Sequence, residues 1–198
     1  MRVFIVLAHL LLSACSMSWL HRDSPTGQPP APEEHAARVA ALKSWRILGR
    51  VSIQRGDQGF AADLDWQHEN GGDVLRLMAP LGAGTYELRR GPSRIELLTP
   101  DGERFSAGGA EELMAARLGW SFPLTGAGYW VRGIPAPEPT PTQENFDERH
   151  RRTDFAQDGW RISVLSYLED LDPALPRKLY LQHDDLKVRL VIKNWKML

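Results

Sequence analysis

The chain has 198 residues, with 24 Lys and Arg against 25 Asp and Glu, so its formal net charge at pH 7 is −1. A near-neutral chain has no sequence-wide positive field to attract nucleic acid, which argues against a nucleic-acid-binding protein. Seven tryptophans supply rigid apolar surface suited to a packed core or to the wall of a lipid pocket.

The chain begins with an apolar segment, residues 3–12, which the only cysteine, Cys15, follows closely. The segment is too short to span a bilayer, which takes about 20 residues, and is typical of a secretory signal. The sequence Leu12-Ser13-Ala14-Cys15 resembles the bacterial lipobox. We therefore expect residues 1–14 to be a lipoprotein signal peptide and Cys15 to carry S-diacylglycerol and N-palmitoyl groups. The alternative is an ordinary signal peptide with an incidental cysteine.

The residues after Cys15 predict an address and a tether. By resemblance to the bacterial sorting rule, Ser16 in place of Asp directs a lipoprotein to the outer membrane, here to its periplasmic face. Residues 16–32 include four prolines, and a proline-rich segment is semi-extended at up to about 3.1 Å per residue. We expect residues 15–32 to be a flexible tether and residues 33–198 to form a single domain.

The domain is expected to contain mostly strands. Residues 33–45 show helical spacing of apolar side chains. Turn signals recur at short intervals after them, and such spacing favours antiparallel hairpins over parallel crossovers. The strands are expected at residues 46–54, 60–68, 73–79, 84–90, 93–99, 103–107, 146–156, 160–168, 177–183 and 187–195.

These strands predict a single antiparallel meander, and a sheet of about ten twisted strands tends to curl. Further helical segments are expected at 110–118 and 128–132, and the proline-rich stretch 135–141 is expected to join two halves of one sheet. The predicted fold class is mainly β with α. Its curled antiparallel sheet forms an open, incomplete β-barrel, with helices covering a hydrophobic cavity.

One strand has an unusually aromatic face. Phe60, Leu64 and Trp66 alternate with polar residues that include Asp63 and Asp65. Because successive side chains of a strand point to opposite faces, we expect the aromatic side to be buried and the two aspartates to be solvated.

The segment 79–84 lies between two predicted strands and carries Leu81 at its centre. Loop tips usually carry small or polar residues, so an apolar tip suggests contact with a membrane or a partner. Packing of Leu81 back onto the sheet is the alternative.

Signals for catalysis and metal binding are weak. The six histidines include no pair at the three- or four-residue spacing of helical metal sites, so no metal is expected. No Gly-x-Ser-x-Gly elbow occurs, and lipidation would consume Cys15, so an enzyme is disfavoured. The basic run 149–152 fits either anionic head groups or an exposed segment that needs solubility.

Several short motifs follow one another along the chain: Trp45, Gly49-Arg50, the aromatic strand ending in Trp66, Pro80-Leu81-Gly82, Asp101-Gly102, Glu111-Glu112-Leu113, Trp130, Gly133-Ile134-Pro135, Gly159-Trp160 and Asn194-Trp195. The order of these motifs resembles the outer-membrane lipoprotein receptor family LolB. The resemblance covers roughly residues 45–195 together with the lipobox.

The resemblance implies a protein that accepts acylated lipoproteins from the periplasmic carrier LolA and inserts them into the outer membrane. It implies no cofactor apart from the lipids on Cys15, a monomer, and a membrane-inserting loop at Leu81. A periplasmic sensor of lipids or lipoproteins with a LolA-like fold is the alternative, followed by a lipid-ester hydrolase and a purely structural anchor. The candidate residues lining the cavity are Phe60, Leu64, Trp66, Leu75, Leu77, Tyr86, Leu88 and Trp130.

Overall fold

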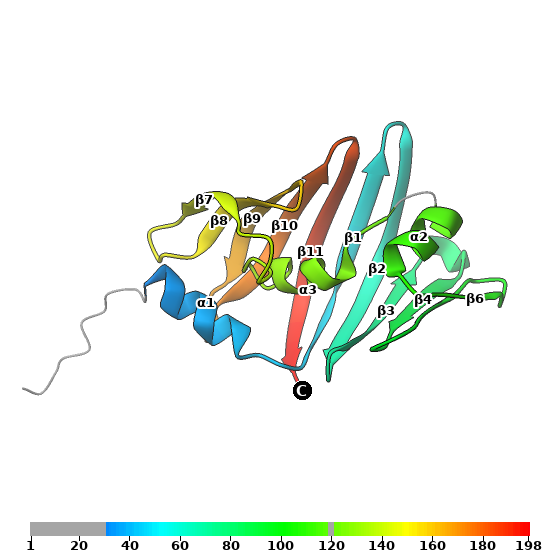
Figure 1. The fold of residues 1–198 in the computed structure, drawn as a ribbon, viewed down its shortest axis with the longest axis horizontal. Coiled ribbons are helices and arrows are strands. Elements are labelled where there is room, and N and C mark those ends of the chain that lie inside the picture. The colour runs from blue at the N-terminus through cyan, green and yellow to red at the C-terminus, as the bar shows by residue number, and fades with distance from the viewer. Residues whose placement is uncertain (1–30, 119–120) are drawn as a thin grey trace, which may run out of the picture.

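A computed structural model describes residues 31–118 and 121–198, which fold around one curled antiparallel sheet (Figure 1). The sheet has eleven strands in the order β6-β5-β4-β3-β2-β1-β11-β10-β9-β8-β7. Its first half contains β1 (Trp45–Arg55), β2 (Gln58–Glu69), β3 (Gly72–Met78), β4 (Thr85–Arg90), β5 (Ile95–Leu98) and β6 (Arg104–Ala107). Its second half contains β7 (Thr142–Phe146), β8 (Arg152–Gln157), β9 (Trp160–Leu168), β10 (Leu175–His183) and β11 (Leu186–Met197).

The strands form two meanders rather than the single one predicted. Strands β1–β6 follow one another across the sheet, as do β7–β11, and the two series meet where β1 pairs with β11 from Trp45↔Met197 to Arg55↔Leu186. Local turn signals cannot reveal this pairing, because its partners lie far apart in the chain. The edge strands β6 and β7 do not pair with each other, so the sheet stays open.

The prediction of one continuous strand over 146–156 is wrong, because the chain turns within this range. Strand β7 ends at Phe146 and β8 begins at Arg152. Between them, the Asp147 carboxylate accepts the backbone N–H groups of Arg149 and Arg151, each at 2.9 Å, and His150 has a left-handed φ of 58°. A short polar side chain that captures nearby backbone donors is a typical turn device.

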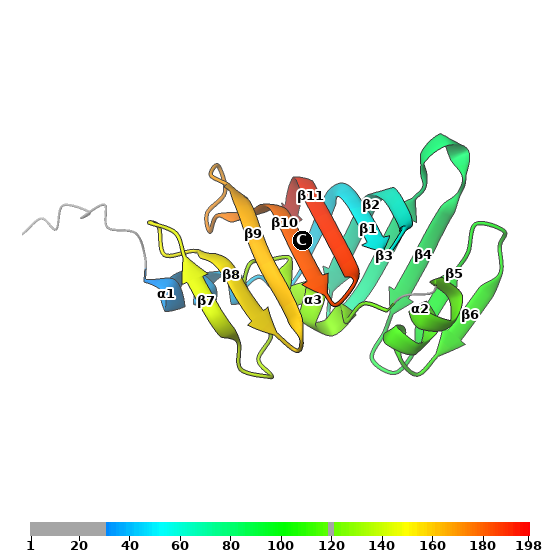
Figure 2. The same ribbon diagram turned by 90° about the horizontal axis from the view of Figure 1, so that it is seen from above.

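The helices cover the concave face of the sheet (Figures 1 and 2). Helix α2 (Ala110–Leu118) has the predicted limits, whereas α1 (Pro32–Ala40) ends earlier than the predicted 33–45 because the chain enters β1 at Trp45. Helix α3 (Leu124–Trp130) overlaps the helical turn predicted at 128–132 but begins and ends earlier. A 3-10 turn, η1 (Pro80–Gly82), stands between β3 and β4.

Buried aromatic side chains close one end of the sheet. The ring of Trp45 lies edge-on to Trp66 and Trp195, with centroids 5.2 and 5.6 Å apart, and is stacked on His68 at 5.3 Å. The three indoles come from β1, β2 and β11. Their contacts therefore stabilise the β1–β11 pairing, which joins the two halves of the sheet. Among the described residues, no helix is both long and apolar enough to cross a membrane.

Candidate functional site

An apolar cavity lies between the concave face of the sheet and the residues Met114, Phe122, Leu124 and Val131. It contains about 750 Å³ of space free of atoms, counting its open mouth, and little of that space is wide enough for a water molecule. The lining residues are all aliphatic, aromatic or Met: Val51, Ile53, Leu64, Trp66, Leu75, Leu77, Tyr86, Leu88, Leu97, Met114, Phe122, Leu124, Val131, Leu181, Val188 and Leu190.

The alternation of the strands produces this wall. In β2, Ala62, Leu64 and Trp66 are buried at two-residue spacing, and Val188, Leu190 and Ile192 repeat the pattern in β11. Side chains at this spacing point to one face of a sheet, so apolar residues from many strands converge on the concave side. Such a wall offers no charge or hydrogen bond to a ligand, and it suits an aliphatic chain.

Six of the eight residues proposed from the sequence to line the cavity do so in the structure: Leu64, Trp66, Leu75, Leu77, Tyr86 and Leu88. Phe60 lies beside the lining, half-buried, with its ring edge-on to Tyr86 at 6.2 Å. Trp130 is not in the wall. Its ring packs against Trp160 at 5.9 Å, and its Nε1–H donates to Gln157 Oε1 at 2.7 Å. A buried indole needs a partner for its N–H, and the partner of Trp130 lies on β8.

Sequence reasoning missed the contributions of β1, β10 and β11. Val51 and Ile53 in β1, Leu181 in β10 and Val188 and Leu190 in β11 all line the cavity. Val51 and Ile53 lie beside the aromatic strand through the β1–β2 hairpin, whereas the β1–β11 pairing brings the residues of β10 and β11 to the same cavity. The helical side is formed by Met114, Phe122, Leu124 and Val131.

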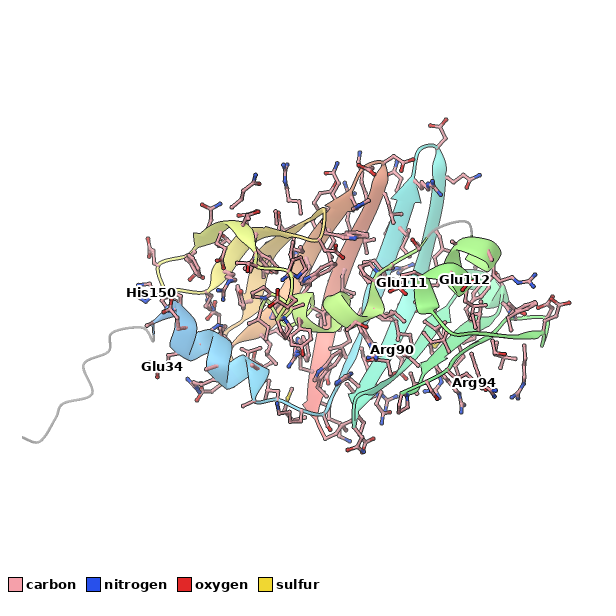
Figure 3. The ribbon with its side chains drawn as sticks, viewed as in Figure 1. Glu34, Arg90, Arg94, Glu111, Glu112 and His150 are labelled. Carbon is pink, nitrogen blue, oxygen red and sulfur yellow. The ribbon has the colours of Figure 1, made fainter. Side chains whose placement is uncertain are left out.

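A buried carboxylate holds Trp66 in the wall. Asp73 Oδ1 accepts the Nε1–H of Trp66 at 2.8 Å and lies 2.8 Å from His68 Nδ1. Arg90, labelled in Figure 3, reaches the other oxygen of Asp73 through Nε at 2.7 Å and also through Nη2. Asp73 is only 3% exposed, and a buried charge is tolerated when it is paired and hydrogen-bonded. This cluster therefore fixes the orientation of Trp66.

Helices α1 and α3 are fastened to each other through a buried arginine. Arg132 donates through Nη1 to the carbonyl oxygens of Val39 at 3.3 Å and Leu42 at 3.1 Å, and through Nε to Gly128 at 2.9 Å. Burial lowers the pKa of this guanidinium. A cation next to carbonyls at the end of α1 is favoured by the helix dipole. The contact ties the end of α1 to the start of the proline-rich segment.

His35 attaches α1 to the segment before β10. Its Nε2 lies 3.0 Å from the carbonyl oxygen of Ala174, which can only accept, so Nε2 carries the proton. Burial lowers the pKa of His35 below its ordinary value of 6.5. The neutral ring is therefore the form that suits this position.

The outer face of the sheet corrects one expectation. Asp63 is exposed as predicted, but Asp65 is only 7% exposed. Arg46 from β1 donates to both of its oxygens, at 2.7 and 2.6 Å, and Arg76 from β3 lies 3.8 Å away. Both arginines come from neighbouring strands, so the sequence of β2 alone could not reveal them.

The loop between β3 and β4 presents Leu81 to solvent. Its side chain is fully exposed, at 105%, and its φ is 58°. The Ala79 N–H donates to the Gly84 carbonyl oxygen at 2.9 Å and closes the base of the loop. Gly84 has a φ of +101°, and a Cβ atom there would collide with the ring of Pro100. The connection projects in Figure 2 on the side of the molecule opposite α3.

The basic run 149–152 does not form a free cationic patch. Arg151 contacts Asp147 and Glu169, Arg149 contacts Glu169, and Arg152 contacts Glu144. These contacts stabilise the β7–β8 turn. The candidate lipidation site Cys15 lies outside the described residues, and among those described no group of three or more His, Cys, Asp or Glu side chains is arranged to hold a metal.

Comparison with known proteins gives concordant matches. A family model described as outer membrane lipoprotein LolB matches residues 43–195. The chain is 34% identical over 197 residues to the outer-membrane lipoprotein LolB of Nitrosococcus oceani, covering 99% of this chain and 98% of that protein. It is 34% identical over 188 residues to the protein of that name from Stutzerimonas stutzeri, covering 94% and 91%.

Solved structures support the fold. A LolA superfamily protein from Nitrosomonas europaea has a TM-score of 0.53 at 8% identity, over 85% of this chain and 94% of that chain. A DUF1329 family protein from Desulfovibrio piger has a TM-score of 0.51 at 10% identity, over 84% and 91%. At such low identities the similarity concerns the fold alone, and it confirms the open antiparallel sheet predicted from the sequence.

Proposed function

Because this chain belongs to the LolB family of outer-membrane lipoproteins, we propose that it accepts acylated lipoproteins from the periplasmic carrier LolA and inserts them into the outer membrane. The observation that carries this proposal is the cavity between sheet and helices, whose lining is apolar throughout. Its occupant in the proposal is an acyl chain of the cargo.

The energetics of an acyl chain explain why a cavity is needed. Each methylene contributes about 0.8 kcal/mol when buried, so exposing a sixteen-carbon chain to water costs about 12 kcal/mol. A carrier and a receptor that both offer apolar walls avoid this cost. Transfer then runs downhill if the carrier, the receptor and the bilayer bind the chain with increasing strength, and no covalent step is required.

The anchor and the body have separate tasks in this proposal. Diacylglycerol and palmitoyl groups on Cys15 hold the protein at the membrane, since several acyl chains together give stable anchoring. The tether of residues 15–32 lets the body reach both the carrier and the bilayer. The body acts as a monomer, and each protein molecule offers one cavity.

Leu81 is the proposed contact with the bilayer. A fully exposed leucine at the tip of a closed loop makes little contribution to the packing of the fold, so a membrane-inserting role accounts for it best. Its position outside the cavity lining separates insertion from cargo binding.

The decisive experiment measures acyl binding by the body. The described fold begins at residue 31, so a mature chain starting at residue 15 with Cys15→Ala keeps every described residue. This chain is expected to take an acylated lipoprotein from the carrier LolA in solution. A folded chain that leaves the cargo on the carrier, and that binds no acylated peptide, would refute the proposal.

A further inference from the structure

A set of cations lies on the convex face of the sheet, opposite the cavity. The set consists of exposed side chains on four adjacent strands, and we call it the basic face: Arg50 on β1, Lys187 and Arg189 on β11, Lys178 on β10 and Arg161 on β9. None of these side chains has a carboxylate of the described residues within 4.0 Å. At its border, Lys193 lies 4.0 Å from Asp63.

The strand register shows that these cations are close neighbours. Val191 on β11 pairs with Arg50 on one side and with Lys178 on the other. Neighbouring strands are about 4.8 Å apart, so two strand spacings separate these two cations. This separation is about 10 Å, which equals the Debye length at 0.1 M salt, so their repulsion is only partly screened.

The other half of the same convex face is built differently. There Arg46 contacts Asp65, and Arg76 and Arg89 both contact Glu87. A face that needs only solubility can carry balanced charge in this way, as β2–β4 do. The chain has a net charge of −1, so the unbalanced cations on β1 and β9–β11 are a local concentration.

Exposed apolar side chains accompany the cations. Leu48, Val191 and Leu165 are 40%, 38% and 65% exposed, on β1, β11 and β9. Like the cations, these side chains point away from the cavity, on the convex face of the sheet. Mixed basic and apolar side chains suit the head-group region of a bilayer, where cations meet anionic lipids and apolar groups reach the upper acyl region.

We propose that the basic face binds the anionic head groups of the bilayer to which the protein is anchored. The family is one of outer-membrane lipoproteins, so a membrane surface lies within reach of the chain. In Figure 2 the β3–β4 connection projects on the side opposite α3, which is also the side of the convex face. Contact through the basic face therefore brings Leu81 toward the bilayer, while the helices α1–α3 face away. This inference concerns orientation and does not depend on what the cavity binds.

The test measures vesicle binding by the mature chain with Cys15→Ala, so that no acyl anchor contributes. The probes are vesicles of phosphatidylcholine alone and of phosphatidylcholine with 30% phosphatidylglycerol, compared by sedimentation at 50 and 300 mM salt. Each basic residue near an anionic surface contributes about 1 kcal/mol, or about fivefold in partitioning. We expect at least tenfold stronger binding to the anionic vesicles at low salt, and a loss of this preference at high salt.

Matched triple variants localise the effect. The first triple variant removes three charges from the basic face through Arg50→Gln, Lys178→Gln and Arg189→Gln. The second triple variant removes three exposed charges outside the basic face through Lys43→Gln, Arg94→Gln and Arg104→Gln. We expect the first triple variant to lose at least tenfold in anionic binding and the second to lose little, with equal melting temperatures and equal acceptance of cargo from the carrier.

Three results would overturn the proposal. Equal binding to both kinds of vesicle, or equal loss in both triple variants, would mean that the basic face does not recognise a membrane. Normal vesicle binding combined with failed transfer from the carrier in the first triple variant would assign the face to a protein partner instead. Failure of cargo binding with intact anionic vesicle binding would count against the proposed function alone.

Discussion

Replacing Leu81 with Asp is expected to separate cargo acceptance from membrane delivery. Leu81 is fully exposed and has a left-handed φ of 58°, which Asp adopts more readily than Leu, so the fold is expected to lose nothing. Burying a leucine in the bilayer gains about 1.5–3 kcal/mol, and an aspartate at the centre of a bilayer costs about 2.5–3.5 kcal/mol. Even if the tip stays near the interface, a loss of about 3 kcal/mol slows delivery roughly a hundredfold.

The assay has two stages with one protein preparation. The first follows movement of an acylated lipoprotein from the carrier to the mature chain in solution, and the second follows its movement from that chain into liposomes. Leu81→Asp should pass the first stage at the wild-type rate and slow the second. Leu198→Asp is the matched control, since Leu198 is a half-exposed leucine at the C-terminus, away from the loop, and should leave both stages unchanged.

Two outcomes would refute this reasoning. If both stages fail and the melting temperature falls, Leu81 takes part in the packing of the protein. If both stages proceed at the wild-type rate, the loop has no role at the membrane.

Three further predictions concern the cavity, the loop and helix α1. Leu77→Asp, which places a charge in the apolar wall, should weaken acyl binding at least a hundredfold because burying that charge costs several kcal/mol. Val74→Asp, on the opposite face of the same strand, should bind acylated peptide normally, and equal affinities in a titration would contradict the assigned wall. Gly84→Ala forces a φ of +101° on a residue with a Cβ atom. Calorimetry should therefore show that the free energy of unfolding falls by about 1–3 kcal/mol. An unchanged free energy of unfolding would show that the loop can rearrange. Burial lowers the pKa of His35, so its stabilising contribution is complete above pH 6.5 and is lost as the pH falls below that value. The melting temperature should therefore drop more for wild type than for His35→Gln between pH 7.5 and 5.0, and parallel drops would argue against this role.

The sequence by itself determined most of the strands and the buried face of β2, because turn signals and alternation are local properties. The apolar face of β2 follows from spacing alone, and Leu75, Leu77 and Leu88 were proposed beside it as further lining residues, where the structure places them. The Pro-Leu-Gly loop was likewise identified by its flanking strands and by an apolar residue where a polar one is usual. The order of short motifs then indicated the LolB family, and the match over residues 43–195 confirmed it.

Only the tertiary structure decided which strands pair and which partners a side chain contacts. The β1–β11 pairing, which brings Val51 and Val188 into one cavity, joins residues more than a hundred positions apart, and no local pattern encodes such a partner. The same reason explains Trp130, whose direction depends on Gln157 of β8, and Asp65, whose burial depends on arginines from two other strands. Local sequence fixes which face of a strand is apolar, whereas pairing and side-chain partners depend on contacts between segments that are distant along the chain.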